Sequence, residues 1–351
     1  MKKSNSKQKA LGAFKKLGVV ALITADTTVS VSFEPNPVEG GAVLILSPDH
    51  LNIKVSANTE DGSDITVEGC TETRLASDTK TTLHARGTTV ILKGKITELD
   101  VSGTDSNEQP LTALDISGLT ALQKLDCDYN QLTSLNVQGL TSLKELYCTG
   151  NQLTALNVQG CASLGRLWCS HNQLTELNVQ GLTALQWLDC SGNQLTALNV
   201  QGLTSLKELY CTGNQLTALN VQGLTALQKL YCSENQLTAL NVQGLTALQE
   251  LYCSYNQLTE LNVQGRASLK ELDCYRNKLN AQAMTELLNA LPARTAGDDA
   301  EATLYTEKTG ITEGNCKDYT QPAELKDAFD GAKKRNWKLK KINASRDLED
   351  I

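Results

Sequence analysis

Apolar residues recur along the chain in a pattern that repeats every twenty-one residues. Between Leu122 and Asn277, eight copies follow one another without an insertion. One copy runs from Leu143 to Val158 and reads Leu-x-x-Leu-x-Cys-x-x-Asn-x-Leu-x-x-Leu-x-Val. A fixed period of this length predicts a solenoid, in which each repeat stacks on its neighbours and one core runs along the array.

The first half of each repeat alternates apolar and polar residues, which is typical of a strand with one buried face. In one copy, Leu146 and Cys148 take the inward positions, while Glu145, Tyr147 and Thr149 take the outward ones. Stacked repeats therefore predict a parallel sheet. The leucines and valine of the second half then point inward from the opposite wall.

A cysteine and an asparagine occur in every one of the eight copies. The cysteines are Cys127, Cys148, Cys169, Cys190, Cys211, Cys232, Cys253 and Cys274, and the asparagines are Asn130, Asn151, Asn172, Asn193, Asn214, Asn235, Asn256 and Asn277. Parallel in-register side chains cannot readily reach the near-perpendicular dihedral of a disulfide, so we interpret the cysteines as buried thiols that pack as small hydrophobes. The asparagine amides are expected to satisfy backbone groups inside the turn. The pairing of Cys70, Cys161 and Cys316 stays open.

Short β-type runs separated by turn residues precede the array. They are Val43–Leu46, Leu51–Ser56, Ile65–Cys70, Thr81–Ala85 and Thr89–Leu92. Two segments, 96–103 and 111–118, match the second half of the repeat, and the turn between them is shortened around 104–110. By extrapolation Thr89 to Ile91 forms the first strand of the array, with Ile91 in place of a ladder cysteine.

After Asn277 the period is lost. The pattern predicts a helix over Leu279–Leu291, a strand at Ala302–Thr306, a helix over Pro322–Lys334 and a strand at Trp337–Ile342. The longer spacing between these strands indicates that helices replace the narrow back wall in the last turns. The expected organisation is a signal segment (1–25), a small β-rich N-terminal cap (26–88), the solenoid (89–278) and an α/β C-terminal cap (279–351).

The first twenty-five residues resemble a secretory signal. Six lysines without an acid precede an apolar run from Leu17 to Ala25. We therefore expect a secreted or cell-surface protein; if the segment is only a basic tail, the protein is cytoplasmic. No later apolar stretch approaches the length needed to span a membrane.

The motif from Leu143 to Leu153 resembles the leucine-rich-repeat consensus. Its second half, Leu-Thr-x-Leu-Asn-Val-x-Gly, is similar to the cysteine-ladder class found in internalin-J-like bacterial surface proteins. The resemblance implies an α/β-type, right-handed, curved solenoid with a parallel sheet on the concave face and a mostly irregular back wall. It also implies protein binding by the concave face and a bacterial adhesion or host-interaction role.

Two outward columns of the strands vary between repeats and contain many aromatic residues. The candidate partner-binding residues are Tyr147, Trp168, Trp187, Tyr210, Tyr231 and Tyr252, with Arg166, Glu208 and Glu250 beside them. Aromatic rows are typical anchors of protein interfaces. In the competing interpretation, Tyr210, Tyr231 and Tyr252 only stack on one another across the strands. Acids outnumber bases in these columns, which favours a basic or neutral partner.

Other function classes have little support in the sequence. The net charge of −7 and the lack of a long basic run disfavour nucleic acid. The three histidines have no metal-ligand spacing, and no set of nucleophile, base and orienting residue is recognisable. We expect a monomeric, non-enzymatic protein without cofactor or metal, which binds a protein ligand. The alternatives are carbohydrate stacking on Tyr147, Trp168 and Trp187, or an intracellular scaffold.

The interpretation of the ladder cysteines can be tested by thiol titration. In protein unfolded without a reductant, we expect at least the eight ladder thiols to react with a thiol reagent, because the ladder geometry disfavours disulfides. A reduced sample supplies the reference value for all eleven cysteines. A count below eight would mean that the ladder is oxidised.

Overall fold

The computed structural model describes residues 19–23, 29–33, 38–103 and 110–351. It consists of two compact units, Met1–Leu143 with Gly150–Leu156, and Lys144–Thr149 with Asn157–Ile351. Most of the expected signal segment lies outside the described residues, as does the expected short turn at 104–109. Within the apolar run, β1 (Val19–Ile23) pairs with β2 (Val29–Phe33). Apart from the start of the array, discussed below, the boundaries of the four expected segments remain predictions.

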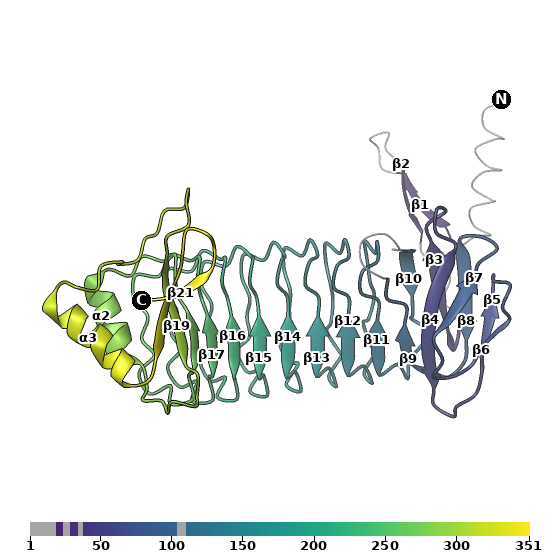
Figure 1. Cartoon of the computed structure of the whole chain (residues 1–351). Helices are drawn as coiled ribbons and strands as arrows, with labels where there is room; N and C mark the ends of the chain where they lie inside the picture. Colours follow the sequence, from purple (N-terminus) through teal and green to yellow (C-terminus); the bar gives the residue numbers. More distant parts are fainter. Residues whose placement is uncertain (1–18, 24–28, 34–37, 104–109) are drawn as a thin grey trace. The chain divides into compact units, whose positions relative to one another are not determined.

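Besides the β1–β2 pair, the described part of the first unit contains two larger groups of strands (Figure 1). One sheet has the order β10-β3-β8-β5-β6, formed by Leu111–Asp115, Gly41–Leu46, Thr89–Lys93, Ile65–Glu68 and Arg74–Leu75. In the other group, β4 (Asn52–Thr59) pairs antiparallel with β7 (Thr81–His84) and β9 (Ile96–Asp100), and β9 pairs parallel with β11 (Lys124–Asp126). All five expected β runs are thus confirmed as strands.

The expected start of the array is wrong. Thr89 to Ile91 belongs to β8, which lies antiparallel between β3 and β5 and not in a parallel ladder. The first ladder strand is β9, and Val101 after it takes the place of the cysteine. The Val101 N–H donates to the Asp126 carbonyl at 2.8 Å, and the Val101 carbonyl accepts from the Asn130 amide at 3.0 Å.

This error has a physical cause in the pattern itself. The spacing Leu-x-x-Leu-x-Val/Cys occurs in both halves of a repeat, so the segment Ile96 to Val101 fits the strand as well as the opposite wall. Strand pairing with distant residues decides between the two positions. The other match is confirmed, because the Leu111 N–H donates to Asn130 as the Leu132 N–H donates to Asn151.

In the second unit, seven short strands lie side by side in a parallel ladder (Figure 1). They are β12 (Glu145–Tyr147), β13 (Arg166–Trp168), β14 (Trp187–Asp189), β15 (Glu208–Tyr210), β16 (Lys229–Tyr231), β17 (Glu250–Tyr252) and β18 (Glu271–Asp273). Equivalent residues of successive repeats are in register throughout. The central leucine of each strand is buried, and the leucines and valines of the opposite wall complete the core.

The ladder asparagines satisfy backbone groups of the turn, as expected from the sequence, and they also connect successive turns. Asn193 is typical: its Nδ2 donates to the carbonyls of Cys169 in the preceding turn and Cys190 in its own turn, both at 3.0 Å. Its Oδ1 accepts from the Leu174 N–H at 3.0 Å. The side chain is only 8 % exposed, so these backbone groups have no ready access to water.

The ladder cysteines form part of the packed core. All eight are fully buried, and all cysteines of the chain are free in the structure. Burial raises the pKa of Cys232 to about 12, so this thiol stays protonated at neutral pH. Cys161 stands where other turns have a leucine such as Leu182, and it is also completely buried. The role of these buried cysteines is packing, since a buried neutral thiol is a poor nucleophile.

The C-terminal segment continues the ladder with helices on the back wall. Its elements are α2 (Ala281–Ala290), β19 (Glu301–Thr306), α3 (Ala323–Lys334), β20 (Lys338–Ile342) and β21 (Leu348–Asp350). β19 pairs parallel with β18, and β20 pairs parallel with β19. The strand ladder thus continues where helices take the place of the narrow back wall, as expected. The antiparallel strand β21 was not predicted.

Two residues of this segment complete the ladder in ways that the sequence analysis missed. Asn315 acts as a ninth ladder asparagine: it donates to the carbonyls of Cys274 and Leu304 and accepts from the Leu279 N–H. The Glu313 carboxylate accepts from the N–H groups of three residues, Arg276, Thr306 and Asn315. Neither residue lies at the repeat spacing, so no period could identify them.

Removing one ladder amide should destabilise the array. We expect Asn193→Ala to lower the free energy of unfolding by about 3 kcal/mol or more, because it leaves several buried backbone groups unpaired at about 1–3 kcal/mol each. Asn199 is a matched control in the same repeat, since its exposed side chain bonds only to the Gln201 N–H. Denaturant unfolding measures both variants. Equal effects would show that the ladder amide has no special role.

Candidate functional site

The nine candidate residues lie on one face of the second unit because strand residues alternate between inside and outside. We call this surface the strand face. It consists of the outward residues of β12–β18, namely Glu145, Tyr147, Arg166, Trp168, Trp187, Asp189, Glu208, Tyr210, Lys229, Tyr231, Glu250, Tyr252, Glu271 and Asp273. The strand register places them in two columns.

The candidate residues differ in their access to solvent. Trp168 is 41 % exposed, whereas Tyr147 is 8 % and Glu250 is 7 % exposed. The other six are partly buried. Trp168 is therefore the most exposed aromatic side chain of this face.

The first part of the strand face combines aromatic rings with cations. Tyr147 and Trp168 meet edge to face with ring centroids 4.9 Å apart. The Arg166 guanidinium lies 4.2 Å from the centroid of Trp187, and the Lys207 amine lies 5.3 Å from it. Each cation–π contact of this kind contributes a favourable interaction energy of about 0.5–1 kcal/mol at exposed sites.

The second part is a row of three tyrosines. Tyr210 and Tyr231 pack edge to face at 4.8 Å, and Tyr231 stacks on Tyr252 at 4.2 Å. The three residues therefore do stack across the strands. Because their ring faces contact one another, less of their surface is open than the sequence suggested.

Each tyrosine hydroxyl of the face donates to a glutamate of the neighbouring column. Tyr147 and Tyr210 bond to Glu145 and Glu208 of their own strands, while Tyr231 bonds to Glu250 of the next strand at 2.5 Å. Tyr252 likewise bonds to Glu271. The Glu250 carboxylate also forms an ion pair with the Lys229 amine at 3.2 Å. This pairing explains how a nearly buried carboxylate is tolerated.

Two further rows of side chains were not among the candidates. Hydroxyl residues follow the cysteine in most turns, and they bond between turns, as Thr149 does with Ser170 at 3.2 Å. At the rim, Tyr255 and Arg276 have positive φ angles of 54°, and the guanidinium lies 4.3 Å from the tyrosine ring. Both rows are visible as columns of the repeat, but periodicity alone could not show that they make contacts.

The three histidines of the chain are not part of the strand face. The described residues contain no group of three or more histidine, cysteine, aspartate or glutamate side chains able to hold a metal ion. His84 pairs with Glu72 at 2.7 Å, outside the strand face, and His171 occupies a turn with a positive φ of 52°. In the described part of the chain, no helix has the length and apolar character to cross a bilayer.

The geometry agrees with known repeat families. A model of the family "Leucine Rich repeats (2 copies)" matches residues 120–160, 183–224 and 225–265. These segments of the chain contain leucine-rich repeats, and the stacked strands have the leucine-rich-repeat fold. This result confirms the fold predicted from the consensus and from the stacked strands.

Solved structures of leucine-rich-repeat proteins resemble it. The functional domain of InlJ from Listeria monocytogenes, which includes a cysteine ladder, shares 32 % identity with a TM-score of 0.50. The match covers 61 % of this chain and 50 % of that chain, so this chain aligns with half of the InlJ domain. The internalin-like character and the cysteine ladder predicted for this leucine-rich-repeat protein are thus supported.

More distant matches have lower scores. A leucine-rich-repeat protein of Leptospira interrogans matches with 25 % identity and a TM-score of 0.45, over 65 % of this chain and 63 % of that one. An internalin, InlF, from Listeria monocytogenes matches with 20 % identity and a TM-score of 0.44, over 60 % and 75 %. A search of curated proteins found no match.

The tyrosine row predicts a distinct alkaline titration. Burial, with the nearby glutamates, raises the pKa of Tyr210, Tyr231 and Tyr252 well above the usual value near 10. Because the folded-state pKa of these tyrosines is raised, the stability that their protonated hydroxyls contribute is fully present below pH 10 and is lost as pH rises above 10. We expect tyrosinate absorbance of these residues to appear only with unfolding. Ionisation of these three tyrosines near pH 10 in the folded protein would contradict their hydrogen-bonded arrangement.

Proposed function

We propose that this leucine-rich-repeat protein binds another protein through the strand face, with Trp168 as the main anchor. The observation that carries the proposal is a tryptophan 41 % exposed on a sheet whose other aromatic residues are partly or fully covered. Tryptophan is enriched among the residues that dominate binding energy. Arg166 lies on the same strand as Trp168, β13, and contacts the ring of Trp187 on the neighbouring strand β14.

The charge of the strand face supports a basic or neutral partner. Its acids are Glu145, Asp189, Glu208, Glu250, Glu271 and Asp273, and its bases are Arg166 and Lys229. Hydrogen bonds from tyrosines leave the charge of the glutamates in place. Such a field accelerates association with a complementary surface and disfavours an acidic one.

We further propose that the protein is exported by a bacterium and acts in adhesion or host interaction without catalysing a reaction. The basic N-terminus with its apolar run supports export, and the likeness to the InlJ domain is compatible with that role. Sequencing of the N-terminus of the protein recovered from its native cell tests this part. An intact Met1 together with cytosolic recovery would remove export.

Carbohydrate binding is the less favoured use of the same residues. Sugar rings stack on open aromatic faces, and this alternative expected three such rings. Tyr147 is only 8 % exposed and its ring packs against Trp168, which leaves fewer open faces. Glycan binding without a protein partner would reverse this preference.

Replacement of the tryptophan tests the proposed function. We expect Trp168→Ala to weaken binding of the partner captured by the wild-type chain by about 2 kcal/mol or more, with little change in thermal unfolding, because the side chain is 41 % exposed and lies outside the core. Tyr129 is a matched control, since it is also 41 % exposed but lies outside the strand face. Calorimetric titration measures both variants. Equal losses, or early unfolding with unchanged binding, would refute the assignment.

A further inference from the structure

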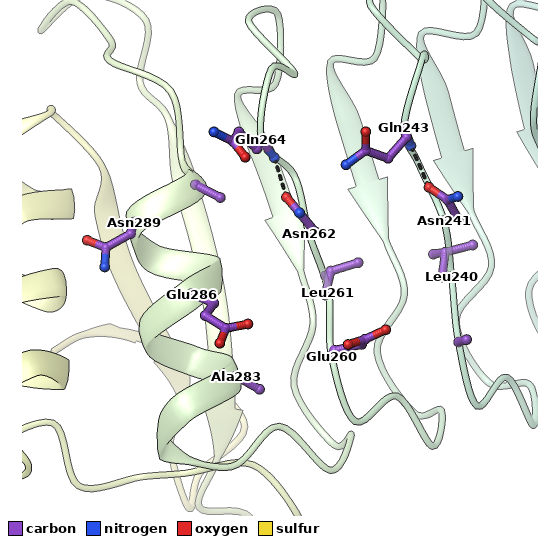
Figure 2. A pocket seen from close by; sticks show the side chains of 12 residues that line it. Leu240, Asn241, Gln243, Glu260, Leu261, Asn262, Gln264, Ala283, Glu286 and Asn289 are labelled. Atoms are coloured by element: carbon purple, nitrogen blue, oxygen red, sulfur yellow. Dashed lines mark hydrogen bonds between the residues drawn. The ribbon is translucent and has the colours of Figure 1, made fainter.

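A second concave region lies on the back wall, away from the strand face. Figure 2 shows a groove between helix α2 and the opposite-wall segments of two repeats, with a volume of about 850 Å³. This volume lies within the range of ligand-binding clefts. It forms where the narrow repeat wall gives way to the wider helix.

Small side chains help to keep the groove open. Ala283 and Ala290 belong to the lining on the helix side, and Ala239 belongs to it on the repeat side. The larger apolar residues of the helix, Met284 and Leu287, are fully buried in the core. The space is thus bounded by a packed helix.

Amide side chains line the repeat side of the groove. The oxygens of Asn241 and Asn262 accept from the N–H groups of Gln243 and Gln264 in their own turns, at 3.0 and 2.8 Å (Figure 2). These bonds fix the orientation of the asparagines and leave their NH₂ groups as donors. Carboxamides offer both donors and acceptors, as a peptide backbone does.

The charge of the groove has one sign. Glu260 comes from the repeat wall and Glu286 from α2, and neither makes an ion pair among the described residues. The lining contains no lysine or arginine. A ligand that supplies a cation therefore finds two carboxylates without competition from a basic side chain of the lining.

We propose that this groove binds an extended segment of a partner protein, with its backbone against the asparagine and glutamine amides and a lysine or arginine side chain at Glu260 and Glu286. The observations that carry the proposal are the size of the groove, its amide lining and its charge complementarity with a basic segment. The site is separate from the strand face and does not depend on the proposed function.

A second copy of this chain fits the groove less well. Three lysines of the C-terminal segment, Lys338, Lys340 and Lys341, already form ion pairs with acids of the same segment. Self-association would have to break these pairs. We therefore commit to a foreign basic segment as the occupant.

Fluorescence anisotropy of a labelled nonapeptide tests the proposal. The probe consists of glycine and serine with a central Arg-Lys pair, and a Glu-Asp version serves as the opposite-charge peptide. We expect full-length protein to bind the basic probe at low ionic strength and not the acidic one. Glu260→Ala combined with Glu286→Gln should weaken binding at least fivefold, because both carboxylates are lost.

Glu176 supplies a matched control. It has the same place as Glu260 four turns earlier, where Ala197, Ala218 and Ala239 stand in the turns between, and it does not line the groove. Glu176→Ala should leave probe binding unchanged, and so should Trp168→Ala, which tests the strand face separately.

Any of the following results would overturn the proposal. The first is absence of binding to the basic probe. The second is an equal loss of binding with Glu176→Ala, which would indicate unspecific attraction. The third is a dimer in sedimentation that disappears with the Glu260 variant, which would make the occupant a second copy. Thermal unfolding of each variant checks that the fold is kept. Retained binding by the folded double variant would equally place the probe elsewhere.

Discussion

The stacked turns depend on the pairing of backbone groups that the tight turn after each strand directs inward. These groups are buried, and an unpaired buried group costs about 1–3 kcal/mol. The ladder asparagine pairs them with one amide, which bonds to its own turn and to the preceding one. A turn is therefore complete only when its neighbour is present. The same requirement holds where the period ends, since Asn315 takes over the role at an unrelated spacing.

This division of labour explains which positions can vary. Asparagine, cysteine and leucine hold the turn from inside, so the outward strand residues are free of the packing of the core. They are not free of one another, because each tyrosine of the strand face bonds to a glutamate and three of them stack. Part of the outer surface therefore stiffens the ladder, and only part of it remains available to a partner.

The sequence predicted well what depends on local spacing. The strands, the buried cysteines, the amide ladder and the two C-terminal helices follow from period, alternation and helical spacing. It failed where distant pairing decides, as at Val101, because the same apolar spacing occurs in both halves of a repeat. It also could not rank the candidate residues. Whether Tyr147 is covered and Trp168 open depends on which side chain stands on the adjacent strand.

Under the proposed function, these contacts give the acids and the tryptophan different roles in recognition. Glutamates that accept a tyrosine hydroxyl are held in place, so they act on a partner through the field of their charge more than through new bonds. Trp168 has no such partner for its open surface, and its burial on binding would contribute directly to affinity. Under the proposed function, charge selects which proteins approach the strand face, and the tryptophan determines how firmly one of them binds.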